Sequence, residues 1–163
     1  MVIIEEPDRR ILVELQKDGR LSNAELSQRV GMSSSPCWRR VRRLEEDEII
    51  LGYRASLSPS ALGLGLIAFV SVKIGAHSDD EAEAFGRAVQ DVPEIVACYS
   101  ITGAADFLLQ IVTADLESYA MLSAKVLRRL PGIKEMNSSL MLNEVKAFKG
   151  LPIQAGGVSR SQR

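Results

Sequence analysis

LSNAELSQRVGMSSSPCWRRVRRL, residues 21–44, predicts two short helices joined by a sharp turn. Ser22 is expected to begin the first helix with a capping box, because Glu25 stands three residues later and can reach back to the Ser22 amide. Gly31 is the residue type expected where the chain turns with a positive φ between two helices. The second helix is expected to start within Ser33–Ser35.

The second of these helices separates an apolar face from an arginine-rich face. Cys37, Val41 and Leu44 recur at i, i+4 and i+7 and form the stripe that we expect to face a core. Four arginines lie within residues 39–43 with no acidic residue among them, and the first acidic residue after them is Glu45. Ion pairing along a solvated face is the commoner origin of such a charge run. Because no acid is interleaved and arginine suits bidentate contact with phosphate and guanine, we favour a nucleic-acid surface.

A third helix is expected in front of these two, with Asp8 as its cap and Gly19 at its end. An arginine-rich helix with a short-polar N-terminus is typical of the recognition element of a helix-turn-helix. Residues 1–53 are therefore predicted to be a three-helix helix-turn-helix DNA-binding domain. For Trp38, packing against this head and contact with the DNA backbone both stay open. The predicted DNA-binding residues are Ser33, Ser34, Ser35, Trp38, Arg39, Arg40, Arg42 and Arg43.

The composition of the whole chain is that of a globular protein with one or two small domains. Its 163 residues are 46% hydrophobic and 25% charged, and the net charge of −1 excludes a generally basic nucleic-acid coat but not a local basic patch. The longest apolar stretch, residues 61–72, is too short to span a bilayer. Two cysteines cannot make a disulfide framework. We therefore expect a cytoplasmic location and no membrane partner.

The pattern changes after a connector, residues 54–64. Strands and helices then alternate as βαββαβ, which predicts a four-stranded antiparallel sheet with both helices on one face and an α+β fold. The expected strands are 66–74, 95–101, 107–112 and 133–148, and the expected helices are 78–89 and 115–130, the latter capped by Asp115 with a stripe of Leu116, Tyr119, Leu122 and Val126. This second domain is expected to span residues 65–150, and residues 151–163 to form a flexible tail.

Several motifs in both halves resemble the Lrp/AsnC transcription regulators. The head contributes DRRIL (8–12), GRLSNAEL (19–26), VGMS (30–33), PCWRRV (36–41), LE (44–45) and ILGY (50–53), and the second domain contributes PEI (93–95), TGAAD (102–106), LPGI (130–133) and VK (145–146). The likeness covers roughly residues 5–152. A helix-turn-helix pattern alone is weak, but this head followed by this βαββαβ unit with its Thr-Gly-x-x-Asp turn is specific.

The resemblance implies double-stranded DNA and a small-molecule effector, an amino acid, as partners. It also implies a ferredoxin-like (ACT-like) sensing domain through which the protein forms a homodimer, with dimers often assembled into octamers. Two residues depart from the family pattern. Glu48 replaces the glycine that usually closes the third helix, so either a left-handed glutamate costs about 1 kcal/mol or the turn differs. Ala105 replaces a common aromatic and alters the shape expected for the effector pocket.

Asp106 is the candidate effector contact within the turn at 102–106. The residues alone leave two roles equally open: stabilising the turn, a frequent role of Asp, or holding the charged groups of a free amino acid together with the backbone of Gly103 and Ala104. The resemblance favours ligand contact. The predicted effector-binding residues are Thr102, Gly103, Ala104, Asp106 and, more weakly, Ser138 with its neighbour Ser139.

No residue pattern indicates catalysis. His77, the single histidine, is expected to be a surface loop residue, and Cys37 and Cys98 lie in different units without zinc-site spacing. Neither a nucleophile–base pair nor a P-loop is present. We therefore expect no enzyme, no cofactor and no metal, and favour a sequence-specific DNA-binding transcriptional regulator that responds to an amino acid. The alternative is an amino-acid-binding regulatory (ACT-like) protein whose helical head serves assembly.

Overall fold

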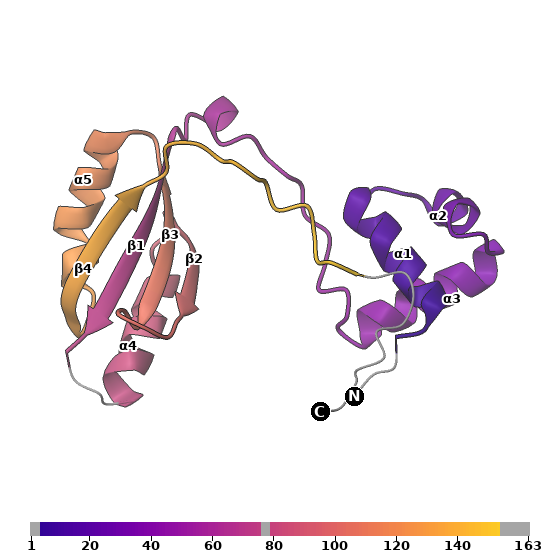
Figure 1. Cartoon of the computed structure of the whole chain (residues 1–163), viewed down its shortest axis with the longest axis horizontal. Helices are drawn as coiled ribbons and strands as arrows, with labels where there is room; N and C mark the ends of the chain where they lie inside the picture. The colour runs from indigo at the N-terminus through magenta and orange to yellow at the C-terminus, as the bar shows by residue number, and fades with distance from the viewer. Residues whose placement is uncertain (1–3, 76–78, 154–163) are drawn as a thin grey trace. The chain divides into compact units, whose positions relative to one another are not determined.

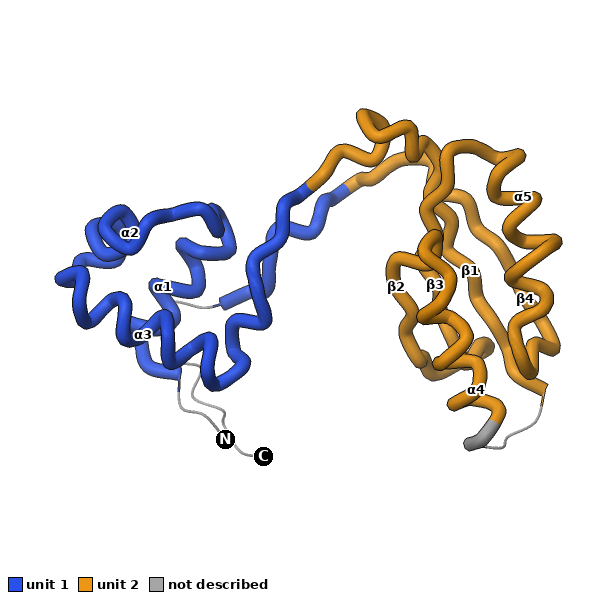
Figure 2. The backbone as a smooth tube through the Cα atoms, turned by 180° about the vertical axis from the view of Figure 1, so that it is seen from behind, with its two compact units in different colours: residues 1–56, 146–163 blue, residues 57–145 orange. Residues whose placement is uncertain are grey.

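The computed structural model describes residues 4–75 and 79–153 and divides the chain into two units (Figure 2). One unit contains residues 1–56 together with 146–163, and the other contains residues 57–145. The first division falls inside the expected connector. The second differs from the expected boundary at residue 150, because residues 146–153 group with the head.

The head contains three helices, α1 (Glu6–Lys17), α2 (Asn23–Arg29) and α3 (Ser34–Glu46) (Figure 1). The prediction that Asp8 caps α1 was wrong, because the helix begins three residues earlier than that cap would place it and its N-cap is Glu5. Pro7 makes the earlier start possible, since the missing N–H of proline costs nothing in a first turn. Asp8 is instead the third helical residue, and its carboxylate accepts a hydrogen bond from the Glu5 N–H at 3.1 Å.

The turn chemistry of the head follows the sequence closely. The capping box is confirmed, because Ser22 Oγ accepts from the Glu25 N–H at 3.2 Å and the Ser22 N–H donates to the Glu25 carboxylate at 2.8 Å. Gly31 has the expected positive φ of 67°. Glu48 takes the left-handed conformation with φ 54°, so the turn after α3 keeps the geometry that glycine usually provides.

The three helices enclose a small core of their own. Its fully buried members come from all three helices and their junctions: Ile11, Leu12, Leu26, Val30, Cys37 and Leu44. Val41 packs against this core while partly buried, so the predicted apolar stripe of α3 is confirmed. Ile153 packs against the same core, and Gln16 Nε2 donates to the Leu151 carbonyl at 3.2 Å. The described part of the expected tail is therefore attached to the head.

The second unit is the expected four-stranded antiparallel sheet. Its strands are β1 (Leu66–Ile74), β2 (Ile95–Ser100), β3 (Phe107–Thr113) and β4 (Ile133–Leu140), in the order β2-β3-β1-β4 (Figure 1). The longest strand, β1, lies in the middle and pairs with both β3 and β4. The last strand ends at residue 140, earlier than the predicted 148.

Both helices of this unit, α4 (Asp79–Gln90) and α5 (Leu116–Lys125), pack on one face of the sheet. The shared core contains Val70 from β1, Phe85 from α4 and Leu122 from α5. Asp115 caps α5 as predicted, since its carboxylate accepts from the Ser118 N–H at 2.8 Å. Helix α5 is shorter than expected and continues as a 3-10 turn at Leu127–Arg129. Among the predicted stripe residues, Leu116 is the exception, with 58% of its surface exposed.

Among the described residues, no helix is long and apolar enough to cross a membrane. His77, expected in a surface loop, lies outside the described residues.

Candidate DNA interface and effector site

Helix α3 presents three different sides to its surroundings. Cys37 and Leu44 are completely buried against α1 and α2. A second edge, at i, i+3, i+4 and i+7, consists of Pro36, Arg39, Arg40 and Arg43 and lines a hollow together with Glu5, the residue that precedes α1. The side opposite the core is exposed to solvent and available to a partner.

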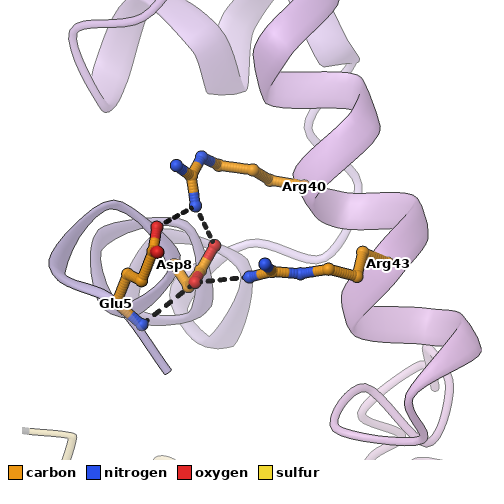
Figure 3. Close-up of polar contacts among 4 residues, drawn as sticks. All are labelled: Glu5, Asp8, Arg40 and Arg43. Atoms are coloured by element: carbon orange, nitrogen blue, oxygen red, sulfur yellow. Dashed lines mark hydrogen bonds and ion pairs between the residues drawn. The ribbon is translucent and has the colours of Figure 1, made fainter. Parts of the chain in front are cut away.

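A fully buried carboxylate ties α3 to α1 (Figure 3). Asp8 has no exposed surface, and its two oxygens accept from Arg40 Nη1 at 2.9 Å and from Arg43 Nη2 at 2.6 Å. Arg40 Nη1 also donates to the Glu5 carboxylate at 2.8 Å. The hydrogen bonds to Glu5 and then to Asp8 raise the pKa of Arg40 above its usual value.

Three of the four arginines form ion pairs, but only Arg42 does so along α3 itself. Arg40 and Arg43 pair with Asp8, a residue more than thirty positions earlier in the chain. Arg42 Nε pairs with Glu46 at 2.8 Å in an i,i+4 arrangement, so the expectation that this charge run is not paired along the helix was wrong for Arg42. Arg39 makes no ion pair within the part of the chain that the structure describes.

Trp38 is half exposed and lies beside Arg42. The Arg42 guanidinium carbon is 5.4 Å from the centre of the indole ring, within the range of a cation–π contact. The contact orders the Arg42 side chain on the surface of α3. Trp38 is therefore a surface residue of the head and not part of its core.

The three serines at the start of α3 divide into two kinds. Ser34 is engaged with α2, since its hydroxyl lies 3.2 Å from that of Ser27 and its carbonyl accepts from Asn23 Nδ2 at 2.9 Å. Ser33 is the N-cap of α3, and Ser35 occupies its first turn. Both are exposed. The contacts of Ser34 fix the start of α3 to α2, although Ser34 is exposed like the other two serines.

In the second unit, Asp106 closes the turn between β2 and β3 onto β1. Its carboxylate accepts from the Ile74 N–H at 2.8 Å, and its own N–H donates to the Val72 carbonyl at 2.9 Å. The turn-stabilising role is therefore present in the structure. One carboxylate oxygen is used for it, and Asp106 is only partly buried, so the group is not closed off from a ligand.

A polar hollow of about 480 Å3 lies beside this turn, on the sheet face that the helices leave uncovered. Its walls come from the turn, from β1 and from β4: Ser71, Lys73, Ala104, Ala105, Glu135, Met136, Asn137 and Ser139. Lys73 and Glu135 are register partners on neighbouring strands. The hollow therefore carries one cationic and one anionic side chain.

The two serines on β4 point to opposite sides of the sheet. Ser139 lines the hollow together with Ala104. The Ser138 hydroxyl instead meets the Tyr119 hydroxyl of α5, on the face covered by helices. The expectation that Ser138 shares a pocket with the turn was therefore wrong, because successive residues of a strand alternate between faces.

Sequence reasoning missed Lys73 and Glu135. A signal for Lys73 was available, because Ser71 and Lys73 are polar at alternate positions of an otherwise apolar strand. Glu135 carried no comparable signal, since β4 is polar at most positions and its register with β1 is a property of the folded sheet.

The two cysteines are free thiols. Burial raises the pKa of both Cys37 and Cys98, which keeps them protonated and unreactive near neutral pH. Among residues 4–75 and 79–153, no group of three or more metal-ligating side chains comes together.

The two units match two family profiles. Residues 4–50 match a winged helix-turn-helix DNA-binding domain, and residues 67–151 match the Lrp/AsnC ligand binding domain. The chain belongs to the Lrp/AsnC family. Such a chain is a transcription regulator with a DNA-binding head and a ligand-binding domain, which confirms the resemblance seen in the sequence motifs.

Relatives in this Lrp/AsnC family match almost the full length of the chain. It is 44% identical over 147 residues to the leucine-responsive regulatory protein of Escherichia coli (strain K12), with 90% of each chain covered. A transcriptional regulator of Neisseria meningitidis, solved in complex with L-Met, matches with a TM-score of 0.87 and 39% identity, over 92% of this chain and 97% of that one. An AsnC family regulator from Agrobacterium tumefaciens gives a TM-score of 0.85 at 32% identity, over 91% and 96% of the two chains.

Proposed function

We propose that this regulator contacts DNA through the solvent-facing side of α3 and binds a free amino acid beside the turn at residues 102–106. The observation that carries the first part is the division of α3 into sides. Ser35 and Arg42 are exposed opposite the buried stripe, and Arg39 is exposed at the border between that side and the hollow. Helix-turn-helix proteins place such a side in the major groove. Arg39 and Arg42 are the proposed base or phosphate contacts, and Ser33, Ser35 and Trp38 the proposed flanking contacts.

The polar hollow supports an amino acid as effector. A free α-amino acid carries a carboxylate and an ammonium group, and the hollow offers an ammonium from Lys73 and a carboxylate from Glu135, next to the backbone of Ala104. Asp106 does not line the hollow itself, but it holds the turn at the edge of the hollow and has a second carboxylate oxygen that does not bind Ile74. The relatives point the same way, since one is named leucine-responsive and another was solved with L-Met. Thr102 and Gly103 are proposed contacts because they complete the same exposed turn.

We further propose that the protein acts as a homodimer in the cytoplasm. One helix-turn-helix head covers a single half-site, and two heads related by a two-fold axis read two half-sites roughly 34 Å apart. The uncovered sheet face exposes Phe69 and Tyr99, two large side chains that a second copy can cover.

Two measurements test this function. A gel shift with duplex DNA from upstream of the protein's own gene should show binding at submicromolar protein. If no duplex shifts, the head serves assembly, and the alternative ACT-like function replaces this one. A thermal-shift screen of the twenty amino acids should then identify the effector, since a ligand at 100 times its Kd stabilises by about 2.7 kcal/mol. Stabilisation by none of the twenty would contradict the proposed effector class.

A further inference from the structure

We propose that the hollow between α1 and α3, lined by Pro36, Arg39, Arg40 and Arg43, binds one phosphate of the DNA backbone. In the DNA-free protein, the Glu5 carboxylate occupies this phosphate site as an internal substitute. The inference rests on the proposed contact of α3 with DNA and adds a specific site and a competing group to it.

The site is built on one edge of α3. Residues 36, 39, 40 and 43 follow the i, i+3, i+4, i+7 spacing of a single helix side, so three guanidinium groups converge on one hollow of about 340 Å3. At about 30 Å3 per water molecule, this volume holds a phosphate group and several waters. Glu5 is the single acidic residue in its lining.

Two carboxylates meet these arginines, and they differ in how firmly they are held (Figure 3). Asp8 is completely buried and receives hydrogen bonds from Arg40, Arg43 and the Glu5 N–H. The Glu5 side chain is 52% exposed, and its ion pair is with Arg40. Glu5 can therefore leave Arg40 for solvent, whereas Asp8 continues to hold both guanidinium groups in place.

The exchange of Glu5 for a phosphate favours the DNA complex. Exposed carboxylate–arginine pairs contribute little to stability, whereas arginine–phosphate pairs form short, parallel hydrogen bonds. DNA binding also releases counterions for every phosphate that is neutralised. Arg43 lines the same hollow while its Nη2 stays bound to Asp8, so its positive charge remains beside the site after Glu5 has left.

Glu5→Gln in the full-length protein tests the exchange directly. Removing the competing charge should raise affinity for DNA about three- to tenfold. The increase should be equal for the upstream duplex and for a random-sequence duplex, because a phosphate contact carries no base information. Asp47→Asn is the matched control: it removes one exposed negative charge from the same head, at the other end of α3, and should change affinity much less.

Salt dependence identifies the phosphate contact itself. Arg40→Gln should reduce the slope of log K against log salt by about 0.9, the loss of one neutralised phosphate. Adding Glu5→Gln to Arg40→Gln should then give no further gain in affinity. An unchanged slope for Arg40→Gln, or equal gains from Glu5→Gln and Asp47→Asn, would overturn the inference while leaving DNA binding by α3 intact. Failure of every form to bind DNA would instead overturn the proposed function.

Discussion

The Asp8 carboxylate of α1 and the Arg43 guanidinium of α3 lie 2.6 Å apart, and the Asp8 side chain is completely buried. These two residues are 35 positions apart in the chain, so the pair couples the rotation of α3 to the position of α1. Arg40 binds the second oxygen of the same carboxylate. The helix that we propose to read DNA is thus oriented by a buried group that itself is inaccessible to DNA.

Asp8→Asn should destabilise the head. Breaking a buried ion pair by removing one partner costs about 3–5 kcal/mol, and the partly exposed arginines reduce this to about 1–3 kcal/mol here because water can solvate them. Trp38, the single tryptophan, lies in the head, so its fluorescence in a urea titration reports this unfolding. Asp47→Asn, which removes an exposed carboxylate, should stay within about 0.5 kcal/mol. Equal stabilities for the two variants would show that Asp8 does not anchor α3.

Arg39→Ala and Arg43→Ala should separate DNA contact from anchoring, although the two residues are one helical turn apart. Arg39 has no ion-pair partner in the described chain, so its loss should weaken DNA binding and change the free energy of unfolding by less than about 0.5 kcal/mol. Arg43→Ala should lower both the DNA affinity and the free energy of unfolding, because it leaves Asp8 with one arginine. Gel shifts and urea titrations of both variants decide this. Full DNA affinity in Arg39→Ala would place the interface elsewhere.

Glu48→Gly should stabilise the head by up to about 1 kcal/mol. Glu48 holds a left-handed φ of 54°, which glycine adopts without the steric cost of a Cβ. Glu46→Gly, two residues earlier and inside α3, is the matched control and should destabilise by about 1 kcal/mol. Destabilisation by both substitutions would show that the Glu48 side chain contributes more than its backbone strain costs.

Asp106→Ala should lower affinity for the amino acid found in the thermal-shift screen by about ten- to a hundredfold, through loss of a charge-assisted hydrogen bond. Because Asp106 also binds the Ile74 N–H, this variant should be less stable as well. Asp106→Asn, which can keep an oxygen acceptor toward Ile74, should recover the stability but not the affinity. Calorimetry with thermal melts separates the two. Unchanged affinity in both variants would leave Asp106 a turn residue alone.

A variant that no longer binds the effector should also no longer show any effect of the effector on its DNA affinity. Coupling between two sites is reciprocal, so an Asp106 variant that loses the amino acid must also lose its effect on DNA affinity. DNA affinity without effector should stay near that of the parent, since the arginines of α3 are untouched. An effector-dependent gel shift that persists in the variant would locate the effector at a different site.

The Tyr53 hydroxyl should lose its proton at a higher pH than an exposed tyrosine does. Burial, and then the hydrogen bond that its hydroxyl donates to Glu45 at 2.9 Å, raise its pKa to about 12. Since the folded pKa lies above the unfolded value of about 10, this contact stabilises the head fully below about pH 10. The stabilisation is lost as pH rises toward 12. Tyrosinate absorbance, with Tyr53→Phe as reference, measures the shift, and titration of Tyr53 near pH 10 would contradict the contact.

The elements of the head and of the sheet can be predicted from the sequence because their signals are local. The capping box at Ser22, the positive φ at Gly31 and the cap at Asp115 each depend on residues within a few positions, and all three are present in the structure. The apolar stripe of α3 follows in the same way from helical periodicity. The order βαββαβ predicted a four-stranded antiparallel sheet, which the structure has, while the strand order came from the structure.

Which charged side chains meet depends on how the helices and strands pack. In the sequence, nothing distinguishes Arg40 and Arg43 from Arg39. The fold brings Asp8 of another helix next to the first two, whereas Arg39 stays exposed to solvent. Likewise, the register between β1 and β4 places Glu135 opposite Lys73 and turns Ser138 away from the turn at 102–106. Ion pairs and pockets depend on atoms that come within a few ångströms only after the helices and strands pack, so a local pattern carries no information about them.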